Sequence, residues 1–64
     1  MATTCVVMFK NGKEQYIEID DWYSSYEWEE TDGYFYLYGV DRGTDTYDQL
    51  AKIRLKAING YYFE

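Results

Sequence analysis

Hydrophobic and polar residues alternate along most of this 64-residue chain, and two tight-turn signals divide the alternating segments. The dipeptides Asn11-Gly12 and Asp32-Gly33 are each flanked by residues of high β propensity, which is the strongest short-range signal for a β-hairpin. The pattern predicts four strands in two hairpins, over residues 3–10, 13–19, 25–31 and 34–40, with residues 20–24 as the link between them.

A two-residue loop at Asn11-Gly12 fixes the register of the first hairpin, because loop length decides which residues stand opposite one another. In that register Val6 lies opposite Ile17, on the face predicted to be the core. Thr4, Met8, Gln15 and Ile19 share that face, and the outward face carries Cys5, Val7, Phe9, Glu14, Tyr16 and Glu18. The first strand is then apolar on both faces, which predicts a central position in its sheet.

The loop at Asp32-Gly33 sets the second register in the same way and places Trp28 opposite Leu37. Trp28, Phe35 and Leu37 therefore join the predicted core.

The other face of the second hairpin has an unusual composition. Tyr34, Tyr36 and Tyr38 project together from one strand, with Glu29 opposite Tyr36 and Glu27 opposite Tyr38. A solvated sheet face explains this pattern, because tyrosine is a favourable strand residue whose hydroxyl stays in water. A binding surface for another molecule explains it equally.

Residues 46–64 fit two structures. Hydrophobic and basic residues alternate strictly over residues 52–57, which predicts a strand over residues 51–56, a turn at Asn59-Gly60 and a final strand over residues 61–63. The alternative is a helix that begins with a capping box at Thr46 and Gln49 and ends at Asn59-Gly60, although Arg54 would interrupt its hydrophobic stripe.

The predicted fold class is therefore all-β, a small antiparallel sheet of five or six strands, built from hairpins and curled toward a barrel-like domain. The alternative is a four-stranded sheet with one C-terminal helix. The length predicts a single domain over residues 1–64. Because so small a domain buries little surface, self-association would add to its stability.

Composition excludes several classes of protein. With 47% hydrophobic and 22% aromatic residues, the chain is too apolar to be disordered. Its longest apolar run spans five residues, 5–9, where a membrane span needs about 20. The N-terminus also lacks the pattern of a signal peptide, so we expect a cytoplasmic protein that does not cross a membrane.

Catalytic and metal-binding chemistry has little support in the sequence. No histidine is present to activate Cys5, which we expect to be a small buried hydrophobe. The five glycines are scattered and form no phosphate-binding loop. Asp41, Asp45 and Asp48 could attract calcium, but their spacing is not that of an EF-hand and favours an acidic turn. We therefore expect a non-enzymatic protein with no cofactor and no metal.

Charge is strongly segregated along the chain. Residues 14–48 contain eleven acidic residues and one basic residue, a net charge of −10, while the remaining residues carry +4, which together give −6. A row of carboxylates on a twisted sheet resembles the phosphate row that DNA-binding proteins recognise, and tyrosine is enriched at interface hot spots. The predicted partner-binding residues are Tyr34, Tyr36, Tyr38, Glu27, Glu29, Asp20, Asp21, Tyr16 and Glu18.

In size, acidity and aromatic content the chain is similar to the small acidic inhibitors that phages encode against host nucleases, repair enzymes or CRISPR effectors. The resemblance implies a partner with a basic, nucleic-acid-binding surface. Two alternatives stay open. One is a structural subunit that forms homodimers through its tyrosine-rich sheet. The other is a single-stranded nucleic-acid binder that uses Lys52, Arg54 and Lys56, which the acidic charge opposes.

Overall fold

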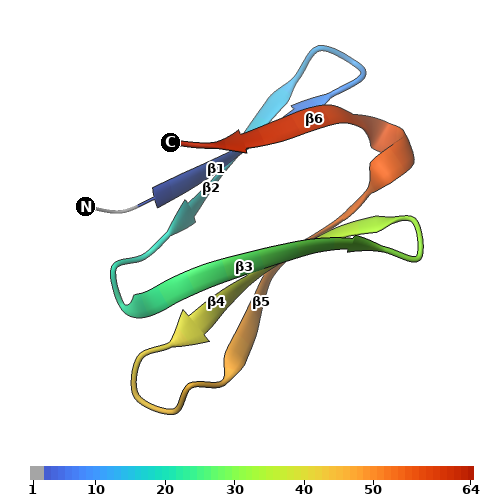
Figure 1. Ribbon diagram of the computed structural model, residues 1–64. Helices are drawn as coiled ribbons and strands as arrows, with labels where there is room; N and C mark the ends of the chain where they lie inside the picture. Colours follow the sequence, from blue (N-terminus) through green and yellow to red (C-terminus); the bar gives the residue numbers. More distant parts are fainter. Residues whose placement is uncertain (1–2) are drawn as a thin grey trace.

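The computed structural model describes residues 3–64, which form six β-strands and one 3-10 helix. In chain order the elements are β1 (Thr3–Phe9), β2 (Glu14–Ile19), β3 (Tyr23–Thr31), β4 (Tyr34–Asp41), β5 (Tyr47–Arg54), η1 (Leu55–Ala57) and β6 (Ile58–Phe63). They build two three-stranded antiparallel sheets, ordered β2-β1-β6 and β3-β4-β5 (Figure 1). The all-β prediction is confirmed, and the alternative of a C-terminal helix is wrong.

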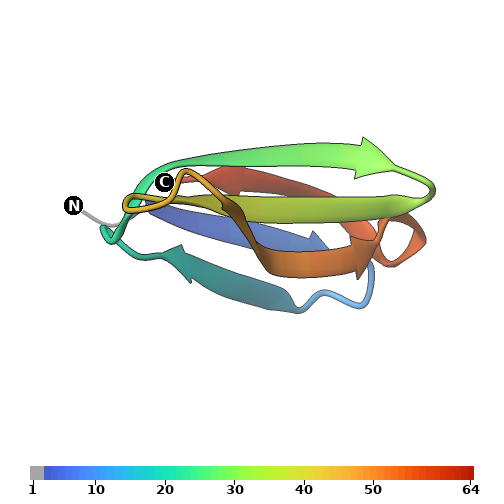
Figure 2. The same ribbon diagram turned by 90° about the horizontal axis from the view of Figure 1, so that it is seen from below.

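The two sheets enclose one hydrophobic core. In Figure 1 the sheet β2-β1-β6 lies above the sheet β3-β4-β5, and Figure 2 views the pair from the side of the second sheet. The buried side chains that form the core cluster are Cys5, Val7, Ile19, Phe35, Leu37 and Ile58. Within residues 3–64 no strand of one sheet pairs with a strand of the other, so the sheets do not close into a barrel.

Aromatic side chains cover the core where β6 runs beside β3. The Phe63 ring centroid lies 4.9 Å from that of Tyr26 and 4.7 Å from that of Trp28. The ring centroids of Tyr61 and Phe35 lie 4.2 Å apart. Trp28, which we predicted in the core, is 48% exposed. It lies on an edge strand, and its ring reaches only the rim of the core.

The register of the first hairpin differs from the prediction by one residue, with Cys5 opposite Ile17. The loop holds three residues, 10–12, because the Phe9 N–H donates to the Lys13 carbonyl oxygen at 2.8 Å. The Gly12 N–H closes a turn onto the Phe9 carbonyl oxygen at 3.0 Å, and Gly12 has a φ of +89°.

This one-residue shift exchanges the two faces of β1, because successive strand residues point to opposite sides, while β2 keeps its predicted core side with Ile17 and Ile19. Cys5 and Val7 face the core, and the predicted core residues Thr4, Val6 and Met8 point outward. Val6 is nevertheless fully buried, since tyrosines stand opposite it on both neighbouring strands. The predicted central position of the first strand is confirmed.

The second hairpin has the predicted register, with Trp28 opposite Leu37 and Glu30 opposite Phe35. Asp32 and Gly33 form a two-residue loop with φ values of +53° and +80°, as expected of the hairpin turn that Asp-Gly favours. Phe35 and Leu37 are fully buried.

The C-terminal third contains the predicted strands with different boundaries. β5 starts at Tyr47, so Gln49 lies within a strand rather than in a helical capping box. The chain turns at η1, whereas we predicted the turn at Asn59-Gly60. Asn59 and Gly60 instead lie inside β6, where a bulge lets Gly60 pair with Met8 and Ile58 pair with Phe9.

Candidate functional site

The outward face of the sheet β3-β4-β5 carries a row of tyrosines along β4. The ring centroids of Tyr34 and Tyr36 lie 6.1 Å apart, and those of Tyr36 and Tyr38 also lie 6.1 Å apart with nearly parallel planes. Glu29 stands opposite Tyr36 and Glu27 opposite Tyr38, as predicted. We define the tyrosine face by eight of the outward side chains of these three strands: Tyr34, Tyr36, Tyr38, Glu27, Glu29, Tyr47, Lys52 and Arg54.

Basic side chains from β5 form the opposite margin of the tyrosine face. Lys52 stands opposite Tyr36 and Arg54 opposite Tyr34. The Lys52 ammonium lies 4.5 Å from the ring centroid of Tyr34 and 5.8 Å from that of Tyr36, within reach of a cation–π interaction. The face therefore grades from carboxylates on β3, across the tyrosine row, to cations on β5.

Sequence reasoning missed Tyr47 as a member of this face. Its ring meets Tyr38 edge-on at 6.2 Å, and its hydroxyl donates a 2.7 Å hydrogen bond to Glu27. Tyr47 points outward because of a bulge at Leu50, which shifts the pairing between Ala51–Leu37 and Gln49–Tyr38. Unbroken alternation from Ile53 would have placed Tyr47 on the core side.

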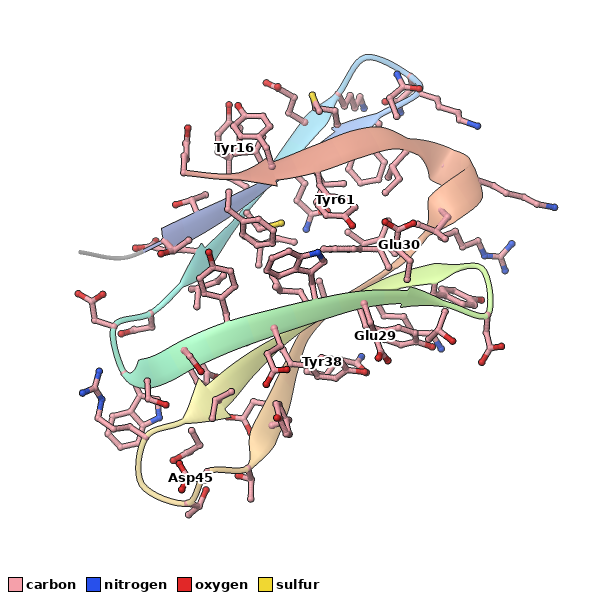
Figure 3. The ribbon with its side chains drawn as sticks, in the orientation of Figure 1. Tyr16, Glu29, Glu30, Tyr38, Asp45 and Tyr61 are labelled. Carbon is pink, nitrogen blue, oxygen red and sulfur yellow. The ribbon has the colours of Figure 1, made fainter. Side chains whose placement is uncertain are left out.

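Tyr38, Tyr47, Trp28, Glu27 and Glu29 line a hollow of about 280 Å³. Figure 3 shows Glu29 and Tyr38 next to each other on the outward side of β3. Burial and the charge of Glu29 raise the pKa of Tyr38, and the hydrogen bond to Glu27 raises the pKa of Tyr47. Both phenols are therefore neutral near pH 7, so the negative charge of the hollow lies on its two carboxylates.

Asp20 and Asp21 lie in the turn between β2 and β3, not on the tyrosine face. The Asp20 carboxylate accepts a hydrogen bond from the Trp22 N–H at 2.9 Å. Arg42, from the β4–β5 loop, donates to the carbonyl oxygens of Asp21 at 2.8 Å and of Trp22 at 3.3 Å. These contacts hold the turn against the neighbouring loop.

Tyr16 and Glu18 lie on the outward face of the other sheet, which points away from the tyrosine face (Figure 3). Tyr16 is 60% exposed, and its hydroxyl donates to Glu14 at 3.3 Å. The charge of Glu14 raises the pKa of Tyr16. The predicted binding residues are thus divided among two faces and a turn, and only Tyr34, Tyr36, Tyr38, Glu27 and Glu29 lie together.

Charge is also separated between the two ends of the molecule. The β2–β3 turn and the β4–β5 loop lie at one end, and the β1–β2 loop, the β3–β4 turn and η1 lie at the other (Figures 1 and 2). The first, acidic end carries Asp20, Asp21, Asp41, Asp45 and Asp48 with Arg42. The second, basic end carries Lys10, Lys13, Arg54 and Lys56 with Glu14 and Asp32.

Cys5 and the β4–β5 loop have the environments of a buried thiol and an acidic turn. Cys5 is fully buried as predicted, and burial raises the pKa of its thiol. The Asp41 carboxylate accepts hydrogen bonds from the Gly43 and Thr44 N–H groups at 2.8 and 3.2 Å, as an acidic turn does. In the described part of the chain, no three Cys, Asp or Glu residues are arranged to hold a metal ion.

None of the helical structure within residues 3–64 has the length and apolar character needed to cross a membrane. No protein-family model matches the sequence, and neither a curated protein nor a solved structure matches it.

Proposed function

We propose that the chain is a non-enzymatic interaction module that binds a basic, nucleic-acid-binding surface of a partner protein through its tyrosine face and so occludes that surface. The observation that carries the proposal is the half-buried, outward-facing tyrosine row of β4, with the exposed residues Glu27 and Glu29 along its β3 margin. The resemblance in composition to acidic phage inhibitors supports the same class of partner.

The geometry of β4 suits protein recognition. Tyr34, Tyr36 and Tyr38 project from the central strand of their sheet, where pairing on both sides holds the backbone. Tyrosine offers a large contact area and has few rotatable bonds to immobilise. A row of such rings on a rigid strand therefore loses little conformational entropy on binding.

The distribution of charge favours a basic partner. Glu27 and Glu29 are exposed on the β3 margin of the tyrosine face. The Lys52 ammonium on the other margin lies over the rings of Tyr34 and Tyr36. At a net charge of −6, long-range attraction would steer a basic surface toward the chain and raise the association rate.

A charge-reversal experiment tests whether the partner binds at the acidic margin of the tyrosine face. The ligand is a protein retained from a host lysate by the tagged chain and then purified, and its association is measured at about 50 mM salt. Glu27→Lys with Glu29→Lys should slow association by about ten-fold or more. The control is Glu14→Lys with Glu18→Lys on the other sheet, which changes the net charge equally and should slow association much less. Equal slowing by both pairs would contradict a binding role for the tyrosine face.

Competition by nucleic acid tests occlusion. Excess duplex DNA should displace the chain from its partner, because both would occupy the same basic surface. Retention of the chain itself, or of single-stranded nucleic acid, in place of a basic protein would instead support the homodimer or the nucleic-acid binder.

A further inference from the structure

The hollow at the β3 margin of the tyrosine face has the lining of a site for one cationic side chain. Its volume of about 280 Å³ is just below the range of about 300–1,000 Å³ that is usual for small-molecule sites. Its walls are aromatic, from Tyr38, Tyr47 and Trp28, and its charged groups are the carboxylates of Glu27 and Glu29. We propose that this hollow receives an arginine side chain of the partner protein, an inference that rests on the proposed function and specifies its central contact.

The two tyrosine rings provide complementary surfaces for a planar cation. Tyr38 and Tyr47 meet at an interplanar angle of 77° with centroids 6.2 Å apart. A guanidinium group that stacks parallel to one ring is therefore nearly perpendicular to the other ring. The hydrogen bond from the Tyr47 hydroxyl to Glu27 fixes the second ring in this arrangement.

The carboxylates favour arginine over lysine. A guanidinium group is planar, stacks on aromatic rings and donates paired hydrogen bonds to a carboxylate. Glu27 and Glu29 lie two residues apart on the same side of β3, so a cation in the hollow has two carboxylates within the lining. The ammonium of lysine is compact and strongly hydrated, so it gains less from neighbouring rings and carboxylates than a guanidinium group does.

The same face already contains a cation stacked on tyrosine. Lys52 lies over Tyr34 and Tyr36, at the other end of the row. Within residues 3–64 no cation of the chain lies over Tyr38 or Tyr47. A cation beside these two rings and their acidic neighbours would therefore come from a partner.

Arginine binding is tested on the intact chain without the partner. N-acetyl-arginine amide is titrated into isotope-labelled protein, and amide shifts of Glu27, Glu29, Tyr38 and Tyr47 are followed by NMR. Saturable shifts at these positions, with at least ten-fold weaker binding of the neutral analogue N-acetyl-citrulline amide, are the expected result. Equal binding of the citrulline amide, or no saturable shift, would overturn the proposal.

Two variants distinguish arginine binding in the hollow from attraction to the acidic chain as a whole. Tyr47→Leu should abolish the arginine shifts, and the matched variant Tyr16→Leu, which removes an equally exposed tyrosine from the other sheet, should retain them. Retained binding in Tyr47→Leu would overturn the site. If arginine fails to bind while Glu27→Lys with Glu29→Lys still slows partner association, the proposed function stands and the arginine site is refuted. Arginine binding without an effect of charge reversal supports the site and refutes the proposed function.

Discussion

At the scale of single residues, the absence of a side chain at Gly39 leaves space for the ring of Tyr23. A Cβ atom at Gly39 would lie 2.6 Å from Cδ1 and 2.7 Å from Cγ of the Tyr23 ring, whose hydroxyl donates to Asp48 at 3.2 Å. Gly39→Ala must displace this ring, and we expect it to lower the free energy of unfolding by about 1–3 kcal/mol, as overpacking does. Urea denaturation measures the change. In a Tyr23→Ala background the same substitution should cost much less, and an equal cost in both backgrounds would contradict the contact.

A second residue-scale prediction concerns the pH dependence of stability. Tyr61 donates a 2.6 Å hydrogen bond to Glu30, and burial with this bond raises the pKa of Tyr61 from 10.0 to about 12. Between these two values the unfolded chain loses the phenol proton and the folded chain keeps it, so stability falls as pH rises. The contribution is complete below pH 10 and is lost as the pH passes 12.

The urea midpoint should therefore decrease from pH 9.5 to 11.5, and it should decrease less steeply in Tyr61→Phe, which has no phenol to titrate. Because the pKa values of Tyr16, Tyr23, Tyr38 and Tyr47 are also raised, the difference in slope between the two proteins is the quantity to compare. Identical slopes would mean that Tyr61 titrates alike in the folded and unfolded chains.

At the scale of elements, the first hairpin depends on one glycine. Gly12 has a φ of +89°, and a Cβ there would meet nothing within 4 Å. Gly12→Ala therefore acts through the backbone alone. We expect it to lower the free energy of unfolding by about 1 kcal/mol, because alanine is disfavoured in the left-handed conformation. Gly60→Ala is the control, because Gly60 lies within β6 without a positive φ, and its added Cβ would lie 3.5 Å from Met8 in ordinary contact. Chemical denaturation should show little loss or a slight gain for Gly60→Ala, and equal losses in both variants would exclude the turn as the cause.

The two hairpins also show why register is only partly predictable. Asn11-Gly12 and Asp32-Gly33 give the same local signal, and the second forms the expected two-residue loop. In the first, the Lys13 N–H bonds to the Asn11 side chain at 2.9 Å, and Gly12 becomes the third loop residue. Loop length reverses the faces of a strand, and β1 is apolar on both faces, so its hydrophobic pattern could not select between the two registers.

At the scale of the whole molecule, the separated charges give opposite expectations for two similar residues. Asp45 lies at the acidic end with a φ of +56°, and Asp32 lies at the basic end with a φ of +53°, where it lines a hollow with Arg54 and Lys56. Asp45→Asn removes repulsion from the neighbouring aspartates, and Asp32→Asn removes attraction to the neighbouring basic residues. We expect the free energy of unfolding to rise for Asp45→Asn and to fall for Asp32→Asn, each by a few tenths of a kcal/mol, as is usual for exposed charges.

Urea midpoints at 10 mM and 1 M NaCl measure these two effects. Asparagine tolerates positive φ at either site, so the backbone contribution is matched. The difference between the two variants should nearly vanish at 1 M, where the Debye length is about 3 Å. Changes of the same sign at low salt would contradict the separation of charge.

The sequence by itself determined the class of fold, the second hairpin, and the outward position of Tyr34, Tyr36 and Tyr38 with Glu27 and Glu29. These features follow from local alternation and a turn whose length is set by its own residues. Only the tertiary structure decided the register of β1, because that depends on which of its apolar faces the second sheet covers. It also decided that Tyr47 joins the tyrosine face, since a bulge at Leu50 resets the alternation of β5, and alternation within one strand carries no signal for a bulge fixed by pairing with its neighbour.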